Sequence, residues 1–442
     1  MPSICDLIRQ FRRERGLSQA KMSAGICSRS HLSHIESGRR LPSPQVLAKL
    51  SDRLNVELIE FFDEYLNSAI TIAGCLQFSR ELTRRGYYKE AESALDASKQ
   101  IIQRGLADAE TWYKFRRDYK DALGYWHRHR GEHDAALRTY REYLELCSRR
   151  PSNQYHLARA HFVVGNNTMY VEGYREAKQP LLLALSHVLS LNPRESTVSS
   201  HLVIELHEKI VQAVLHVLVR LKDYAVTRVL FQMARLRWAE LGILKEPNES
   251  ILLNAGVSLL GLGETEEAKK MFQEILGRDE IDPSNRRACL ANLGLIHRIM
   301  GKPHRALAVL KEAWELYQKQ GGWQGRAVVN GIAQCHLELA NDEEAAAWVR
   351  LAEDIREAYP LDPDPDSVAQ TLVIKSKLLR HLNTNEGLAC LEEAEHLELS
   401  QESRWGIAFE KLRYRIEGGH ALTNIVKDLD TLERRLPGLF LL

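Results

Sequence analysis

The fold of the N-terminal part is decided by residues 16–38, which read GLSQAKMSAGICSRSHLSHIESG. Ser18 is a natural N-cap for a helix that Gly25 ends, and Ser28 can cap a second helix that runs to about Glu36. Two short helices joined by a glycine-containing turn predict a helix-turn-helix unit.

Three further helices are expected around this unit. Upstream, apolar side chains recur at helical spacing at Ile4, Leu7, Ile8 and Phe11. Downstream, Ser43 and Pro44 match the N-cap and the first residue of a fourth helix, and a fifth helix is expected over Glu57–Tyr65. The sequence therefore predicts a compact all-α bundle over residues 1–66.

Three segments of this bundle carry a family resemblance: Gly16–Gln19, Ile26–Gly38 and Pro42–Ser43. They resemble the Cro-repressor type of helix-turn-helix, and the match covers almost all of residues 1–56. The variant Ile-Cys before the third helix, with Ile-Glu-Ser-Gly after it, is similar to the PlcR/NprR type of peptide-pheromone receptors, the RRNPP family. The resemblance implies a cytoplasmic transcription regulator for quorum sensing, which binds DNA and is controlled by a short signalling peptide.

The third helix has two faces with different expected roles. Leu32 and Ile35 share one face and should pack in the bundle core with Leu17, Met22 and Leu47. The resemblance implies that the opposite face enters the major groove of double-stranded DNA. The residues that it assigns to DNA binding are Gln19, Ser28, Arg29, Ser30, Ser33, His34, Arg39 and Arg40.

Within this set the implied roles differ. Arg29, Ser30 and His34 would read base edges, with Arg29 suited to a bidentate contact with guanine. Gln19 would bond a phosphate, and Arg39 with Arg40 would add backbone contacts. For these last two arginines, solvated loop charge is the alternative interpretation. Arg12 and Glu36 match a family ion pair between the first and third helices and are assigned to structure.

Charge separates the N-terminal region from the rest of the chain. Residues 1–53 contain ten Lys and Arg side chains against four Asp and Glu side chains, a net charge of +6. The whole chain has a net charge of +1, so the remainder has a net charge of −5. A basic N-terminal region suits phosphate groups.

The remainder contains a repeated pattern in which a small residue lies near the start of a helix. These starts are expected at Tyr88–Ala91, Asp134–Ala136, Tyr174–Ala177, Asp223–Ala225, Glu266–Ala268, His304–Ala306, Glu343–Ala345 and, more weakly, Asn385–Gly387. Twelve residues earlier another small residue often occurs, at Gly124, Gly165, Ala213, Gly256, Gly294 and Ala333. Close approach of two helices would explain both positions.

This pattern resembles the tetratricopeptide repeat. Residues 69–442 are therefore expected to form eight or nine helix pairs, wound into a right-handed superhelix whose concave face is lined by the first helix of each pair. The resemblance also implies that this domain binds the peptide and forms a homodimer or a higher oligomer.

Three asparagines are expected on the concave face at about one per repeat: Asn254, Asn292 and Asn330. An inward asparagine can donate to and accept from a peptide backbone. In the peptide-pheromone receptors, asparagines at matching places hold the peptide, and Arg298 could pair with its carboxylate. The alternative is that these asparagines form hydrogen bonds within or between helices.

Other classes of function have weaker support. The seven cysteines are scattered and form no C-x-x-C pair, which argues against disulfides and zinc. The group His127, His129 and His133 has no further ligand in register, so neither a metal nor a cofactor is expected. No local catalytic signature or membrane span is found, and no enzyme activity is expected.

Two alternatives stay open at this point. In the first, the repeats grip a protein partner, as in Rap-type modulators of the phosphorelay, and the DNA-binding region is secondary. In the second, the chain is a phage-like repressor without a small ligand. A short secreted pro-peptide encoded next to the gene would favour peptide sensing.

Overall fold

The structure is a computed structural model that describes most of the chain as α-helices. The described residues are 4–40, 42, 44–56, 69–103, 109–149, 154–191, 198–240, 247–319, 325–359, 364–380, 382–397, 399 and 401–417. Within these ranges there is no β-strand, and no helix is both long and apolar enough to cross a membrane. The chain divides into two compact units, Met1–Val217 and Leu218–Leu442, and each is described by itself.

The N-terminal head of the first unit contains four described helices: α1 (Ile4–Glu14), α2 (Gln19–Ser23), α3 (Arg29–Glu36) and α4 (Pro44–Leu54). The expected caps are present, because Ser18 Oγ accepts from the backbone N–H of Lys21 at 3.2 Å and Ser28 Oγ from that of His31 at 3.1 Å. Gly25 has a φ of +71°, which favours glycine in the turn between α2 and α3. The fifth helix expected over Glu57–Tyr65 lies outside the described residues.

The core of the head is the one that the sequence predicts. Leu32, Ile35 and Met22 are fully buried, Leu47 is nearly so, and Leu17 packs against them. Burial of each large apolar side chain contributes about 1.5–3 kcal/mol. This packing fixes the rotation of α3, so its opposite face must point to solvent.

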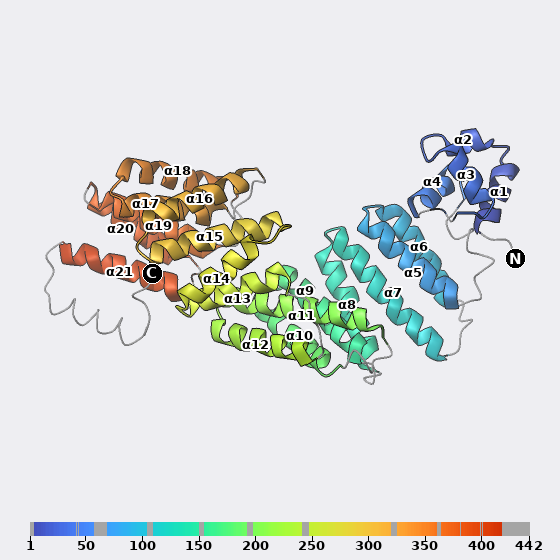
Figure 1. The fold of residues 1–442 in the computed structure, drawn as a ribbon, viewed down its shortest axis with the longest axis horizontal. Helices are drawn as coiled ribbons and strands as arrows, with labels where there is room; N and C mark the ends of the chain where they lie inside the picture. The colour runs from blue at the N-terminus through green and yellow to red at the C-terminus, as the bar shows by residue number, and fades with distance from the viewer. Residues whose placement is uncertain are drawn as a thin grey trace. The chain divides into compact units, whose positions relative to one another are not determined.

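Antiparallel helix pairs follow the head in the described part of each unit (Figure 1). In the first unit they are α5 (Ala69–Arg84) with α6 (Tyr88–Gln103), α7 (Ala109–His129) with α8 (His133–Ser148) and α9 (Gln154–Val171) with α10 (Tyr174–Leu189). The helix α11 (Ser200–Arg220) runs across the division and precedes α12 (Tyr224–Glu240).

The second unit continues the same pattern. Its pairs are α13 (Glu249–Gly261) with α14 (Thr265–Leu276), α15 (Pro283–Ile299) with α16 (Pro303–Gln318), α17 (Gly325–Glu338) with α18 (Asp342–Ala358) and α19 (Pro365–Leu379) with α20 (Thr384–Glu395). One more described helix, α21 (Gln401–Glu417), packs against the last pair. The predicted helix starts are confirmed at all eight second helices.

The small residue of each repeat is the fourth residue of the second helix, and its N–H donates to the carbonyl of the residue before the helix. One expected position is wrong. In α12 the fourth residue is Thr227, which is fully buried and bonds to Asp223 at 2.9 Å, whereas Ala225 is exposed. The helix begins at Tyr224, so its fourth residue is Thr227. The alanine of the motif Asp-Tyr-Ala therefore lies two residues before the position that the small residue occupies in the other second helices.

The glycines of the first helices have the expected role in close packing. At Gly294, an added Cβ atom would lie 2.4 Å from Leu310 of the partner helix. A glycine contacts a larger residue of the partner helix in the same way in three other helix pairs. These contacts are Gly124 with Tyr140, Gly165 with Leu181 and Gly256 with Phe272. In each pair the larger residue follows the small residue of its helix by four positions, one helical turn.

Candidate DNA and ligand sites

The outward face of α3 is polar and exposed. Arg29, Ser30, Ser33 and His34 are all exposed, while Leu32 and Ile35 hold the helix to the core. The side chains that the resemblance assigned to base reading therefore lie together on one helix face. A helix that presents exposed polar groups in this way can enter the major groove.

A buried carboxylate ties the start of α2 to α1 and α3. Glu36 accepts hydrogen bonds from Arg12 Nε at 2.5 Å, from Arg12 Nη2 at 2.9 Å and from Gln19 Nε2 at 2.8 Å. Burial opposes ionisation of Glu36, but the hydrogen bonds from Arg12 and Gln19 outweigh it and hold its pKa below the usual value. The predicted Arg12–Glu36 pair is confirmed, and Gln19 joins it.

The loop after α3 places two more cations beside the recognition face. The N–H groups of Arg39 and Arg40 donate to the carbonyl of His34 at 3.0 and 3.2 Å, and both side chains are exposed. Ser28 is also exposed, although its hydroxyl oxygen is used as the helix cap. Seven of the eight residues predicted to bind DNA are thus exposed on α3, at its N-cap or in the following loop, whereas Gln19 is partly buried and bonded to Glu36.

The three predicted peptide-binding asparagines do not share one environment. Asn254 and Asn292 lie two residues before their glycines, and each amide nitrogen donates at 2.8 Å to the carbonyl four residues earlier, of Ser250 and of Ala288. They therefore occupy the same position in successive repeats. Asn254 is 8% exposed, and Asn292 is partly buried.

Asn330 lies in a different register, three residues before Ala333, and this offset turns it toward α19. Its amide nitrogen donates to the Ser367 carbonyl at 2.8 Å, and its oxygen accepts from Thr371 Oγ1 at 2.9 Å. The side chain is fully buried. Asn330 thus forms the hydrogen bonds between helices that the alternative interpretation expects, and the amides of Asn254 and Asn292 form bonds within their helices.

Arg298 is already engaged in an ion pair. Its Nη2 lies 3.0 Å from Glu338 of α17, and the arginine side chain is 16% exposed. A ligand carboxylate would have to share it with Glu338. Nearby on α19, Lys377 has its pKa lowered to about 8 by burial and by the surrounding charges of Arg413 and Arg298. This part of the second unit thus carries an excess of positive groups.

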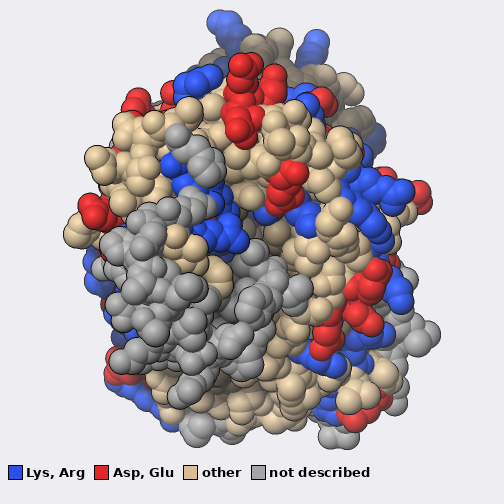
Figure 2. Space-filling view, turned by 90° about the vertical axis from the view of Figure 1, so that its left-hand side faces the viewer, with Lys and Arg blue, Asp and Glu red and all other residues tan. Residues whose placement is uncertain are grey.

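The face of the molecule at the end that carries α18, α20 and α21 has both signs of charge. In Figure 2, Lys and Arg side chains are interspersed with Asp and Glu side chains over the coloured part of this face. Such a mixed surface gives no electrostatic reason for nucleic acid to bind there. The concentration of exposed cations around α3 is a better match for phosphates.

The first unit contains a hollow that the sequence did not reveal. It has a volume of about 660 Å³ and is lined by the first helices of successive pairs, α5, α7, α9 and α11. Its lining includes Phe78, Arg80, Tyr125, Tyr155, Arg159 and Leu202. We call it the α5–α11 hollow. It confirms, for these four helices, that first helices line a concave surface.

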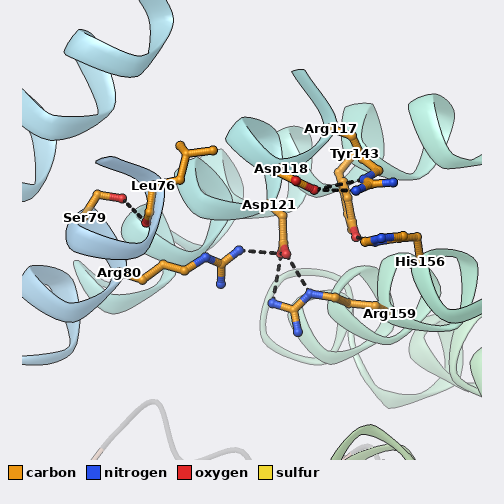
Figure 3. A network of polar contacts seen from close by, with 9 residues as sticks. All are labelled: Leu76, Ser79, Arg80, Arg117, Asp118, Asp121, Tyr143, His156 and Arg159. Atoms are coloured by element: carbon orange, nitrogen blue, oxygen red, sulfur yellow. Dashed lines mark hydrogen bonds and ion pairs between the residues drawn. The ribbon is translucent and has the colours of Figure 1, made fainter. Parts of the chain in front are cut away.

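One carboxylate holds two arginines at the wall of this hollow (Figure 3). Asp121 of α7 accepts from Arg159 of α9 at 2.6 and 3.2 Å and lies 2.7 Å from Nη2 of Arg80 of α5. Burial would raise the pKa of Asp121, but the charges of Arg159 and Arg80 lower it to about 2. The carboxylate is therefore ionised at neutral pH, and three helices meet at it.

The histidine group considered for metal binding has other contacts. His127 Nδ1 lies 2.6 Å from Glu132, His129 Nδ1 lies 2.9 Å from the carbonyl oxygen of Tyr125, and the His133 ring stacks on Tyr170. In the part of the chain that the structure describes, no cluster of three or more His, Cys, Asp or Glu side chains could hold a metal ion.

Comparison with protein families matches both parts of the chain. Residues 8–61 match a helix-turn-helix family, and residues 249–282 and 286–319 each match a tetratricopeptide repeat family. Comparison with curated proteins gives no significant match. The chain thus carries a helix-turn-helix domain followed by tetratricopeptide repeats.

Comparison with solved structures also gives matches. A Rap protein complexed with competence and sporulation factor is 12% identical, with 84% of this chain and 98% of that chain covered and a TM-score of 0.51. Two others are the quorum sensor NprR from B. thuringiensis in its apo form (14% identity, coverage 89% and 96%, TM-score 0.41) and Bacillus thuringiensis PlcR in complex with the peptide PapR7 and DNA (15%, coverage 70% and 99%, TM-score 0.33). At these identities the Rap structure supports the repeat fold alone.

Proposed function

We propose that this helix-turn-helix protein with tetratricopeptide repeats is a transcription regulator of the peptide-pheromone receptor (RRNPP) family, controlled by a short peptide bound to its repeats. The observation that carries the proposal is the outward face of α3, where Arg29, Ser30, Ser33 and His34 are exposed together on a helix anchored by its other face. Exposed polar groups on a rigid helix are what reading of base edges requires.

In this proposal the head, residues 1–66, is the DNA-binding domain, and residues 69–442 bind the peptide and form a homodimer. A dimer brings two recognition helices to half-sites one helical turn apart, so the operator is palindromic. The seven cysteines are free, and a reducing cytoplasm keeps them so. No cofactor takes part.

The peptide contact is assigned to Asn254 and Asn292. Both asparagines occupy the same repeat position on successive first helices, so they can grip successive units of an extended backbone. Asn330 is given a structural role, because its donor and acceptor are bonded to α19. Arg298 can receive the peptide carboxylate with the N–H groups that Glu338 leaves available.

Selection of binding sites from a pool of random duplex DNA tests the DNA half of the proposal. The wild-type chain should enrich a palindromic site, and Arg29→Ala should cost about 1–3 kcal/mol and relax preference at one base position of each half-site. The reason is that loss of a bidentate arginine removes discrimination without removing phosphate contacts.

Arg40→Ala serves as the matched control, because it removes the same charge from the neighbouring loop. It should weaken binding to all sequences about equally and reduce the salt dependence of binding by about one phosphate contact. If Arg29→Ala leaves the enriched sequence unchanged, Arg29 does not read a base. If the wild-type chain enriches no sequence, the head is not a sequence reader.

A further inference from the structure

At the inner wall of the α5–α11 hollow, two arginines are paired with a single carboxylate. One carboxylate, Asp121, would be neutralised by one arginine, yet it holds both Arg80 and Arg159. Asp121 is 6% exposed, whereas the side chains of Arg80 and Arg159 are 29% and 26% exposed. The two guanidinium groups therefore form the accessible part of the cluster.

Most hydrogen-bond donors of these two arginines are free to meet a ligand. Each guanidinium has five N–H bonds, and Asp121 takes only two from Arg159 and one from Arg80 among the described contacts. Because both groups are held by the same carboxylate, they are fixed before a ligand arrives. Two prearranged guanidinium groups suit an oxyanion, either carboxylate or phosphate.

The other cations of the lining have carboxylate partners of their own. Arg84 lies 2.8 Å from Glu81, and Lys209 lies 2.5 Å from Glu205. These pairs leave the Arg80 and Arg159 couple as the net positive centre of the wall. An anion in the hollow would be drawn to that couple.

Apart from Gly74 and Gln77, the remaining lining is apolar and aromatic. Arg80 lies over the ring of Tyr125, 5.5 Å from its centroid. Tyr155 of α9 also lines the hollow. Leu202 is 45% exposed, so it offers an apolar surface to whatever occupies the hollow. A hollow of about 660 Å³ that combines the Arg80 and Arg159 couple with apolar and aromatic side chains has the size of a small-molecule site.

We propose that the α5–α11 hollow binds a small organic anion with an apolar or aromatic body, and that Arg80 and Arg159 hold its carboxylate or phosphate group. This ligand is separate from the peptide assigned to Asn254 and Asn292. Phe78 lines the hollow and also packs against the core of the head, so a ligand there contacts a side chain that supports the DNA-binding domain.

Calorimetric titration of the full chain with three matched probes tests the proposal, in a buffer free of other carboxylates and phosphates. The probes are phenyl phosphate, phenylacetate and the neutral phenylacetamide. At least one anion should bind at one site per chain with a Kd of about 1 mM or tighter, and the amide should bind at least about tenfold more weakly. The anion with the lower Kd shows whether the site prefers a phosphate or a carboxylate group.

Two variants with the same change of charge locate the site. Arg80→Gln should weaken the binding of the anion about tenfold or more, because it removes one of the two guanidinium groups but leaves Asp121 paired with Arg159. Arg138→Gln removes an exposed arginine from α8, away from the hollow, and should leave binding unchanged. Hydrogen exchange with the anion present should slow in α5, α7 and α9.

Three results would overturn the proposal. They are binding of neither anion at about 10 mM, equal binding of the amide and the anions, and equal loss of affinity in the two variants. Because the test uses neither DNA nor peptide, its failure leaves the proposed regulatory function standing.

Discussion

Replacing Glu36 with alanine should lower the free energy of unfolding of the head by about 3–5 kcal/mol, because it leaves a buried guanidinium without its partner. Glu36 is 3% exposed and Arg12 has a side-chain exposure of 12%. The substitution also removes the acceptor of the Gln19 amide. Hydrogen exchange of α1, α2 and α3 in the full chain measures this loss directly.

The control is Glu14→Ala, which removes an exposed carboxylate that accepts from Gln10 at 2.9 Å. It should change the stability of the head by less than about 0.5 kcal/mol. The pKa of Glu36 is lowered in the folded state, so its contribution is present above the pKa of an unfolded glutamate. It is lost as the pH falls through the folded pKa. Similar losses in both variants would show that the Glu36 cluster does not hold the head together.

Gly294→Val should destabilise the second unit by about 3 kcal/mol, because the pair α15 and α16 has no room for a side chain at that point. An added Cβ atom would lie 2.4 Å from Cγ and from Cδ2 of Leu310, which is 3% exposed. The helices must then separate, and separation uncovers the core around them. Chemical denaturation of the full chain, followed by hydrogen exchange in α15 and α16, measures the effect.

Gly74→Ala is the matched control, because Gly74 also lies inside a first helix but has nothing within 4 Å of an added Cβ atom. Alanine should stabilise α5 there by up to about 1 kcal/mol through its better helix propensity. A Gly294→Val chain as stable as the wild type would refute the close approach of α15 and α16.

Much of the head could be predicted because its signals are local. Ser18 and Ser28 cap the helices that directly follow them, and Gly25 occupies the turn between them. The helix pairs could be predicted equally well, since alanine or glycine stands at the fourth position of seven of the eight second helices that the structure describes. Local chemistry and repeat periodicity are therefore enough to predict the all-α fold class.

The sequence did not predict side-chain directions correctly where a shift of one or two residues along a helix turns a side chain to another face. Thr227, rather than Ala225, fills the small position of α12, because a buried threonine can replace alanine there. Asn330 lies one position away from the register of Asn254 and Asn292, and about 100° of helical rotation turns it into the contact with α19. Counting along the sequence does not resolve such differences.

The α5–α11 hollow was missed for another reason. Its central residues, Arg80, Asp121 and Arg159, occupy different positions within their own repeats, so no periodic pattern connects them. They meet only because successive helix pairs are displaced from one another when they stack. That displacement depends on packing between pairs, which a repeat motif does not specify.

We propose that one chain binds both a peptide and DNA, and that each ligand changes the affinity for the other. Calorimetric titration of the full chain with short peptides encoded beside its gene, with and without the selected operator, tests it most directly. One peptide should bind, and Asn292→Ala should weaken its binding by about 1–3 kcal/mol. Operator DNA should change the affinity for the peptide by the same factor by which the peptide changes the affinity for DNA. A chain that binds none of these peptides, or binds one equally well with and without the operator, would contradict the account.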